Sequence, residues 1–355
     1  MIRVLVVDDS VVVQRVLTRE LNKLEGIQVV GTAGDPYVAR ERIAELRPDV
    51  ITLDIEMPRM DGLTFLGKLM RHHPIPVVVV SSLAPEHSEM ALNALSLGAV
   101  DVVSKPSSQF SVPDAAGKLG EAIRSASIAR VRKAALITAP KPIQSLPLPS
   151  TSRVLAIGAS TGGTRALEEI LSRFPADGPA TVIVQHMPVD FTAAFAKRLN
   201  TLCAMHVREA VDGDPLVNGL VLVAPGGKHL RVIKNGGHYG VRVEDGDPVR
   251  FHKPSVDVLF QSVARAAGAN SMGVILTGMG DDGARGLLAM RQVGAQTVGQ
   301  DEATSVVFGM PKVADEMGAV EMVVPLERIA DAALTWTRAF SRKMQAVRPP
   351  LPPTH

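Results

Sequence analysis

Five short runs of Val, Ile and Leu alternate, in the first third of the chain, with segments whose apolar residues recur at helical spacing. Continuous apolar runs are typical of parallel strands buried on both faces, and the segments between them favour amphipathic helices. Strands are expected at Ile2–Val7, Val29–Gly31, Val50–Leu53, Val77–Val80 and Val100–Val103, and helices at Val11–Leu24, Val38–Leu46, Leu63–Arg71 and Glu89–Leu97. The alternation predicts an α/β domain with a five-stranded parallel sheet of the flavodoxin type.

The same alternation resumes at Arg153 and continues through the second half of the chain. Strands are expected at Val154–Ile157, Thr181–Gln185, Leu220–Ala224 and Gly273–Leu276, and helices at Thr164–Arg173 and Phe191–Leu199. The run Asn235–Gly237 is a hairpin turn signal between Leu230–Ile233 and Gly240–Val243. The second half is therefore predicted to be a doubly wound, mostly parallel α/β domain with an added antiparallel hairpin.

The length of 355 residues allows two domains, each with a core of its own. We expect the first at residues 1–124 and the second at residues 151–345. Between them, residues 125–150 contain Pro140, Pro142, Pro147 and Pro149, and prolines at this density oppose helix and sheet pairing. We predict a semi-rigid linker there and a disordered tail at residues 346–355.

Composition excludes several classes of protein. A net charge of +2 and 3% aromatic residues offer no electrostatic or stacking surface for nucleic acid. Cys203 is the single cysteine, which excludes an internal disulfide and a multi-cysteine metal site, and its apolar neighbours favour a core position. No apolar run approaches the roughly 20 residues of a membrane helix, and Met1–Leu5 predicts a strand rather than a signal peptide. We expect a soluble, cytoplasmic protein.

Polar side chains follow four of the strands predicted in the first domain. Asp8 and Asp9 come after the first strand, Asp54 after the third, Ser81 after the fourth and Lys105 after the fifth. Ligands of open parallel sheets bind outside the carboxyl ends of the strands, so these five side chains are predicted to share one crevice.

The residue types in that predicted crevice are suited to phosphoryl transfer. Clustered carboxylates repel one another unless a cation lies among them, and hard oxygen ligands suit Mg²⁺. A carboxylate such as Asp54 can attack a phosphoryl group and form an aspartyl-phosphate. Lys105 supplies a positive charge and Ser81 a hydroxyl donor for the transferred oxygens.

A second constellation lies in the second domain. Gly158–Gly163 satisfies G-x-S-x-G, in which a tight strand-to-helix turn exposes Ser160, although glycine-rich loops after strands also bind nucleotides. His186 ends the next predicted strand and is a candidate base, and either Asp281 or Asp282 is placed to orient it. The order Ser-His-Asp differs from that of α/β-hydrolases, but geometry rather than order makes a triad.

The histidines of the second domain allow two other interpretations. His186 beside a proline is also consistent with a purely structural histidine. His229 and His252 suggest a metal hydrolase, but no H-E-x-x-H or comparable spacing accompanies them. The sequence therefore predicts no metal or other cofactor in the second domain.

The first domain resembles response-regulator receiver domains. The segments that carry the resemblance are Val6–Ser10, Asp54–Gly62, Ser81–Ser82 and Lys105–Pro106. The resemblance implies that Asp54 is phosphorylated by a partner histidine kinase of the CheA type. Receivers often carry an aromatic residue three positions before the lysine, whereas this chain has Val102, so aromatic rotamer switching there cannot transmit the signal.

The same resemblance implies how the receiver pocket is used. The Mg²⁺ ligands would be the carboxylates of Asp8, Asp9 and Asp54 and the backbone carbonyl of Glu56. Ser81 and Lys105 would contact the phosphoryl group.

The second domain resembles the catalytic domain of the CheB family of chemotaxis protein-glutamate methylesterases. The matching segments are Gly158–Gly163, Gln185–Pro188, Ala224–His229, His252–Phe260, Leu276–Ala284 and Gln300–Pro311. The resemblance implies a triad of Ser160, His186 and Asp282, with the backbone N–H of Met279 as an oxyanion donor. Asp281 stands where the family often has asparagine.

Together the resemblances imply an enzyme that the phosphorylated receiver activates. It would hydrolyse glutamate methyl esters, and deamidate specific glutamines, on methyl-accepting chemoreceptors. We expect a monomer that binds neither nucleic acid nor the membrane directly.

Two rival functions stay open at this stage. The chain could be a non-catalytic phosphate sink or adaptor, which the presence of Ser160, His186 and Asp282 opposes. It could also be an esterase for a small molecule or for a receptor outside chemotaxis. A receiver-linked transcription factor is excluded because no basic helix-turn-helix follows the linker.

Overall fold

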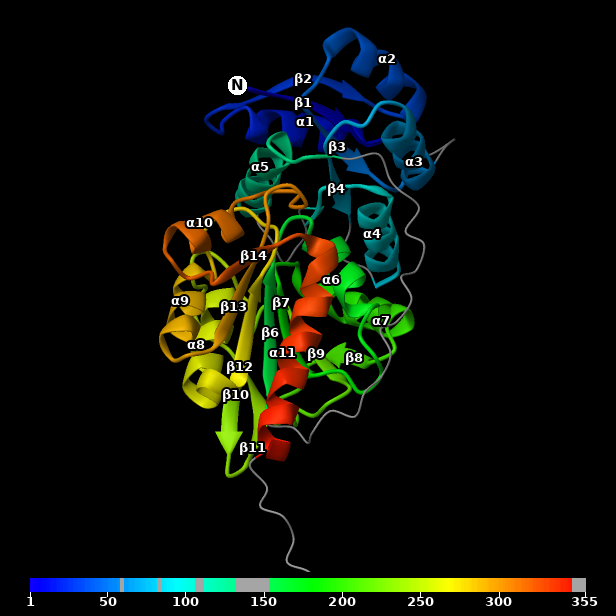
Figure 1. Ribbon diagram of the computed structural model, residues 1–355. Coiled ribbons are helices and arrows are strands. Elements are labelled where there is room, and N and C mark those ends of the chain that lie inside the picture. The colour runs from blue at the N-terminus through cyan, green and yellow to red at the C-terminus, as the bar shows by residue number, and fades with distance from the viewer. Residues whose placement is uncertain (58–60, 82–84, 106–111, 132–152, 347–355) are drawn as a thin grey trace, which may run out of the picture.

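The computed structural model describes residues 1–57, 61–81, 85–105, 112–131 and 153–346. Outside these described residues lie most of the predicted linker and most of the predicted tail. The motif residues Pro58, Ser82 and Pro106 also lie outside them. Two α/β domains pack against each other, with the smaller domain (blue to cyan) above the larger one (green to red) in Figure 1.

The smaller domain has the predicted five-stranded parallel sheet, in the order β2-β1-β3-β4-β5. Val4 and Val6 face α1 and α5, whereas Leu5 and Val7 face the other helices, so both faces of the sheet are buried as the apolar runs predict. Its elements are β1 (Ile2–Val7), α1 (Val11–Leu21), β2 (Ile27–Ala33), α2 (Pro36–Leu46), β3 (Val50–Asp54), α3 (Gly62–His72), β4 (Val77–Ser81), α4 (Pro85–Leu97), β5 (Asp101–Ser104) and α5 (Val112–Ser127).

Helix starts in this domain follow from local chemistry. Asp35 caps α2 by accepting hydrogen bonds from the N–H groups of Tyr37 and Val38, and Pro36 occupies the first turn, where no N–H is needed. Asp61 caps α3 through the N–H of Thr64. These caps satisfy backbone donors that a helix cannot satisfy itself.

The larger domain has a seven-stranded sheet in the order β14-β13-β12-β6-β7-β9-β8, with every recorded pairing parallel. The predicted hairpin is confirmed: β10 and β11 pair antiparallel around a turn at Gly236 and Gly237. The strands are β6 (Val154–Ala159), β7 (Ala180–Gln185), β8 (His206–Glu209), β9 (Leu220–Val223), β10 (His229–Asn235), β11 (His238–Glu244), β12 (Ser271–Ile275), β13 (Gln296–Gln300) and β14 (Met322–Val324).

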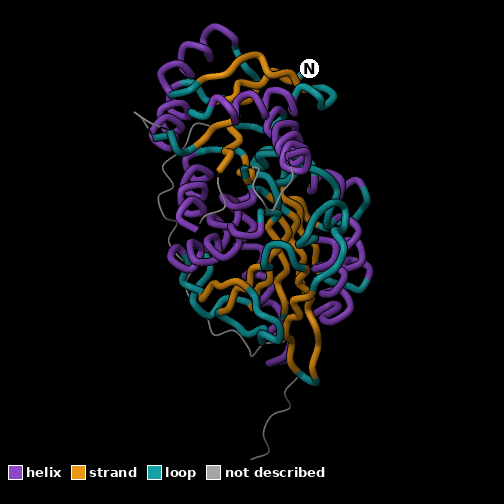
Figure 2. Tube along the Cα trace, turned by 180° about the vertical axis from the view of Figure 1, so that it is seen from behind, coloured by secondary structure: helices purple, strands orange, loops and turns teal. Residues whose placement is uncertain are grey.

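Helices cover both faces of the larger sheet, as the view from behind in Figure 2 also shows. One face carries α6 (Gly163–Leu171), α7 (Thr192–Leu202) and α11 (Leu326–Ala346), with the 3₁₀ turn η1 (Val189–Phe191). The other carries α8 (Val256–Ala267), α9 (Ala284–Gln292) and α10 (Met310–Glu316), and η2 (Gly268–Asn270) follows α8. Strand order reverses beside β6, because the chain runs from β6 toward β8 on one side and from β12 toward β14 on the other. Crevices at such switch points are the usual ligand sites of open α/β sheets.

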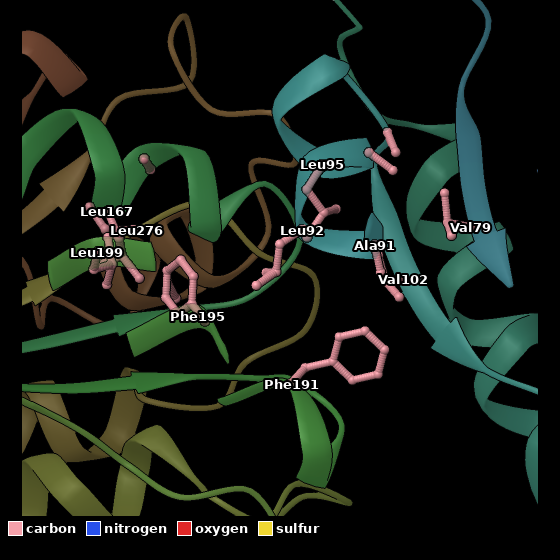
Figure 3. Packing of buried hydrophobic residues seen from close by; sticks show 14 of the residues in the cluster. Val79, Ala91, Leu92, Leu95, Val102, Leu167, Phe191, Phe195, Leu199 and Leu276 are labelled. Carbon is pink, nitrogen blue, oxygen red and sulfur yellow. The ribbon is translucent and has the colours of Figure 1, made fainter. Parts of the chain in front are cut away.

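The domains meet along α4, which lies against η1, α6 and α7. Apolar side chains form one continuous cluster across this boundary, with Leu92 from the smaller domain near Phe191 and Phe195 from the larger (Figure 3). Two polar contacts flank it: Lys197 Nζ lies 2.9 Å from Glu89 Oε1, and Arg198 Nη2 donates to Ser96 Oγ at 2.7 Å. No helix within the described residues is long and apolar enough to cross a membrane.

Candidate functional site

Ser160 follows β6 directly, at the switch point of the larger sheet. Its N–H donates to the carbonyl of Thr277 at 3.0 Å, and its own carbonyl accepts from the N–H of Gly163 at 2.7 Å as the chain turns into α6. The turn requires glycine at position 162, where φ is +79° and a Cβ would lie 2.6 Å from Val306. The G-x-S-x-G segment thus forms the sharp strand-to-helix turn that its sequence predicts.

His186 lies beside Ser160 because β6 and β7 are neighbours in register. Ala159 pairs with Gln185, and the N–H of His186 donates to the carbonyl of Ala159 at 3.0 Å. The His186 side chain is only 8% exposed, and its Nε2 lies 2.8 Å from Asp282 Oδ2. Its Nδ1 is buried and has no hydrogen-bond partner in the described part of the chain, so no hydrogen bond joins it to Ser160 there.

Asp282 rests on the N-terminus of α8. Its carboxylate accepts hydrogen bonds from Ser255 Oγ at 2.8 Å and from the N–H groups of Val256 and Asp257 at 2.7 and 3.1 Å. Burial acts to raise the pKa of Asp282, but the hydrogen bond and charge of His186, together with these N–H groups, outweigh it and lower the pKa to about 2. Asp282 is therefore ionised and fixes Nε2 of His186 as the protonated nitrogen.

Strand spacing alone leaves open whether Asp281 or Asp282 orients His186, and the contacts of the two carboxylates differ. Asp281 is 46% exposed and pairs with the guanidinium of Arg250, whereas Asp282 contacts His186. Gly278 allows the loop before them to approach Ser160 closely, since a Cβ there would lie 2.6 Å from Ser160 Cβ. The next residue, Met279, donates no hydrogen bond from its N–H within the described residues.

The sequence presents His252 as a possible metal ligand and as part of a segment shared with the CheB family, but it does not place the ring beside His186. The His252 ring stacks on that of His186, with centroids 3.7 Å apart and planes 9° apart. Burial and the neighbouring His186 lower the pKa of His252 to about 3, so it is neutral near pH 7. His229 is held by Ser255 N–H and by the carbonyl of Asp247, which is a structural role.

Ser255 and the start of α8 were also missed as parts of this site. A serine directly before an apolar run of helical period is an N-cap signal, and it was present in the sequence. Nothing in that signal indicates that the N-terminus of the helix faces Asp282, because the two segments meet only in the fold.

The acidic pocket forms at the carboxyl edge of the smaller sheet. Carboxylate oxygens of Asp8, Asp9 and Asp54 all lie within 4.8 Å of one another. Lys105 Nζ lies 2.7 Å from Asp54 Oδ2 and 3.3 Å from Asp8 Oδ2. Ser81 is buried at the end of β4, next to this group in the sheet.

Electrostatics in the pocket favour an added cation. Burial is the largest influence on Asp8 and Asp54 and raises the pKa of each, despite the opposing effect of Lys105. Burial acts to lower the pKa of Lys105, but its contacts with Asp54 and Asp8 raise it overall. Asp8 Oδ2 is buried and accepts no hydrogen bond within the described residues, where it has the ion pair with Lys105. An all-oxygen set with one incompletely satisfied carboxylate fits a hard dication such as Mg²⁺.

A polar chain from the smaller domain reaches the residue after Ser160. Ser125 Oγ donates to Thr161 Oγ1 at 2.9 Å, and Thr161 Oγ1 donates to Asp101 Oδ2 at 3.2 Å. Burial raises the pKa of Asp101 to about 6, even though hydrogen bonds and the nearby His186 act to lower it. These hydrogen bonds connect β5 and α5 of the smaller domain directly to the loop that carries Ser160.

The fold defines a receiver-like domain joined to a larger, doubly wound α/β domain with an antiparallel hairpin. Comparison with known families agrees for both halves. Residues 4–115 match the response regulator receiver domain family, and residues 155–333 match the CheB methylesterase family. The chain belongs to the CheB methylesterase family.

Two relatives match over nearly the whole of this chain and of their own. A protein of Syntrophus aciditrophicus named protein-glutamate methylesterase/protein-glutamine glutaminase 2 is 53% identical, over 93% of this chain and 97% of its own. A Rhodopseudomonas palustris protein-glutamate methylesterase/protein-glutamine glutaminase of the group 3 operon is 52% identical, over 95% of this chain and 97% of its own. The crystal structure of the CheB methylesterase catalytic domain of Thermotoga maritima is 34% identical and superposes with a TM-score of 0.51, covering 52% of this chain and 98% of its own.

Proposed function

We propose that this chain removes methyl groups from glutamate γ-esters, and ammonia from specific glutamines, on methyl-accepting chemoreceptors. The observation that carries the proposal is the pair of His186 and ionised Asp282 beside Ser160 at the switch point of the sheet. Family membership supplies the substrate class. The proposal assigns the reaction to the cytoplasm and to a monomer.

In the proposed reaction, Nδ1 of His186 takes the proton of Ser160 while the serine oxygen attacks the ester carbonyl. The tetrahedral intermediate collapses, the C–O bond to methanol breaks, and His186 returns the proton to the departing methoxide. Water then attacks the acyl-enzyme with His186 again as base, which releases the glutamate carboxylate and restores Ser160. A glutamine substrate follows the same path with ammonia as the leaving group.

Asp282 supports each step by stabilising the imidazolium that forms on His186. Against the effect of burial, His186, and then the N–H groups at the start of α8, lower the pKa of Asp282 to about 2, so Asp282 does not compete for the transferred proton. The N–H of Met279 is assigned to the oxyanion, and a donor in that role is worth roughly 10²–10³ in rate. The ring of His252, which stacks on His186, is neutral and therefore adds no second positive charge beside the imidazolium.

We further propose that Asp54 is phosphorylated by a histidine kinase of the CheA type. Asp8, Asp9 and Asp54, with the carbonyl of Glu56, would hold Mg²⁺, which when bound neutralises charge on the phosphoryl oxygens. Lys105 is already in contact with Asp54, and Ser81 ends the adjacent strand. Each of the two would donate to one phosphoryl oxygen.

The described contacts suggest how phosphorylation would reach Ser160. Strand β5 carries Asp101, which contacts Thr161, at its start, and Lys105, which contacts Asp54, just beyond its end. Within the described residues β5 is an edge strand that pairs with β4, and its buried Val102 lies in the core where an aromatic switch would otherwise be. A cavity of about 310 Å³ between the domains borders Gly162, so the packing beside the serine loop is incomplete. We propose that phosphorylation shifts β5 and loosens the cover over Ser160.

The test is methanol release from methylated receptor membranes, with and without Mg²⁺ and a small phosphodonor. We expect Ser160→Ala to take up phosphate but release no methanol, and Asp54→Asn to release methanol without stimulation. Ser172→Ala, at the end of α6, is a matched control and should behave as wild type. Full methanol release by Ser160→Ala would refute the catalytic proposal and favour an adaptor. Release from a small ester but not from receptors would favour a generic esterase.

A further inference from the structure

Beside the candidate active site, Arg250 and Phe251 form a two-residue turn whose backbone conformation is unfavourable for these residue types. Val249 and His252 exchange backbone hydrogen bonds of 3.0 and 2.9 Å, with Arg250 and Phe251 between them. Both central residues have positive φ, 51° and 67°. Turns with positive φ at both central positions strongly prefer Asn and Gly, and bulky residues there are genuine outliers.

Side chains on either side hold this turn in place. The Arg250 guanidinium pairs with Asp281, and its Nε lies 3.4 Å from Asp257 Oδ2. Lys253 Nζ lies 2.7 Å from Asp245 Oδ1. The surroundings therefore impose a conformation that the sequence disfavours locally, a situation that clusters at functional sites.

Phe251 is the side chain that this turn presents to solvent. It is 92% exposed, although the smaller domain is docked, and a phenyl ring gains nothing from such exposure. The next residue, His252, stacks on His186, so the ring is anchored one residue away from the candidate catalytic imidazole. A solvent-exposed aromatic ring on a rigid support is the kind of anchor that protein interfaces use.

We propose that Phe251 is a docking residue for the protein substrate and determines specificity for receptors over small esters. The inference rests on the proposed function. Where the substrate glutamate lies on a helix, its neighbours three and four residues away share its face, about one turn or roughly 5.4 Å along the axis. Phe251 packs on an apolar neighbour of this kind while the ester enters the site. It contributes binding energy and takes no part in the chemistry.

The test compares Phe251→Asn with Phe251→Leu, because asparagine tolerates positive φ and leucine keeps an apolar side chain. Val293→Ser is the matched control, since Val293 is 46% exposed at the end of α9, away from the carboxyl edge of the sheet. Each variant is assayed on methylated receptor membranes and on a blocked glutamate γ-methyl ester. Phe251→Asn is expected to lower kcat/KM on receptors about tenfold, mainly through KM, as truncation of a docked aromatic does. Phe251→Leu and Val293→Ser should stay within about twofold of wild type.

Three results would overturn the inference. The first is an unchanged receptor kcat/KM in Phe251→Asn, and the second is an equal loss on the small ester, which indicates disturbance of His252. The third is a concentration-dependent dimer in sedimentation that Phe251→Asn abolishes, which assigns the ring to a second copy of this chain. Co-sedimentation with receptor membranes in the Ser160→Ala background tests docking without turnover. Wild-type methanol release no greater than that of Ser160→Ala refutes the proposed function separately.

Discussion

Asp101 offers a direct way to change the strength of the domain interface. It is partly buried where the smaller domain meets Thr161, and its pKa is raised from 3.8 to about 6. We expect undocking to expose Asp101 and return its pKa toward 3.8, so that the docked state binds more protons than the undocked state. Docking is therefore favoured below about pH 4 and weakens as pH rises to about 6.

The size of this effect follows from the shift. A difference of about two pKa units at 1.36 kcal/mol each weakens docking by at most about 3 kcal/mol above pH 6, less whatever solvent screens. Asp101→Asn removes the charge but keeps an oxygen that can accept from Thr161 Oγ1. We expect the variant to dock more tightly than wild type at pH 7.5, and by a smaller margin at pH 4.5, where the docking penalty of wild type is only about 1 kcal/mol.

Two measurements check this expectation. Hydrogen exchange reports docking directly, and amides of α4 and η1 should be better protected in Asp101→Asn at pH 7.5. Basal methanol release should fall in the variant by up to about 100-fold, the equivalent of about 3 kcal/mol. The ratio of variant to wild type at each pH cancels the protonation requirement of the chemistry itself. Unchanged protection together with equal or higher basal release at pH 7.5 would refute the reasoning.

Four further predictions concern the two sites. Asp282→Asn should lower kcat about 10³–10⁴-fold while leaving phosphate uptake intact, because the wrong tautomer of the base is then favoured; an equal loss of phosphate uptake would indicate misfolding. Ser255→Ala should lower the free energy of unfolding by about 1–3 kcal/mol in denaturant titrations, since it removes both a helix cap and a hydrogen bond to a buried carboxylate. His252→Phe, which keeps a stacked neutral ring, should retain more kcat than His252→Ala; equal losses would refute a stacking role. Asp8→Asn, or chelation of Mg²⁺, should abolish phosphate incorporation at Asp54, and incorporation in EDTA equal to that in Mg²⁺ would exclude the proposed metal site.

Much of the fold was available from local pattern. Apolar runs alternating with amphipathic segments predicted the five-stranded parallel sheet, and Asn235–Gly237 predicted the hairpin, because period and turn chemistry are properties of neighbouring residues. The short edge strands β8 and β14 and the strand β13 were not predicted. β8 and β13 are four and five residues long and include polar members, and β14 is only three residues long, so none of them has enough apolar positions to form a pattern.

The sequence by itself determined that Asp8, Asp54 and Lys105 would converge, and that Ser160 and His186 would lie side by side. Each of these residues ends a parallel strand, and the rule that ligands gather at strand carboxyl ends needs no coordinates. The residues that reach the site from elements other than β6 and β7 could be identified only from the tertiary structure.

Three features were decided by the tertiary structure alone: the support of Asp282 by the N-terminus of α8, the stacking of His252 on His186, and the contact of Asp101 with Thr161. In each case the partners come from segments with no fixed spacing between them. Their meeting depends on where the N-terminus of α8 lies and on how two separately folded domains dock. Local sequence patterns carry no information about such distances, because packing between elements sets them.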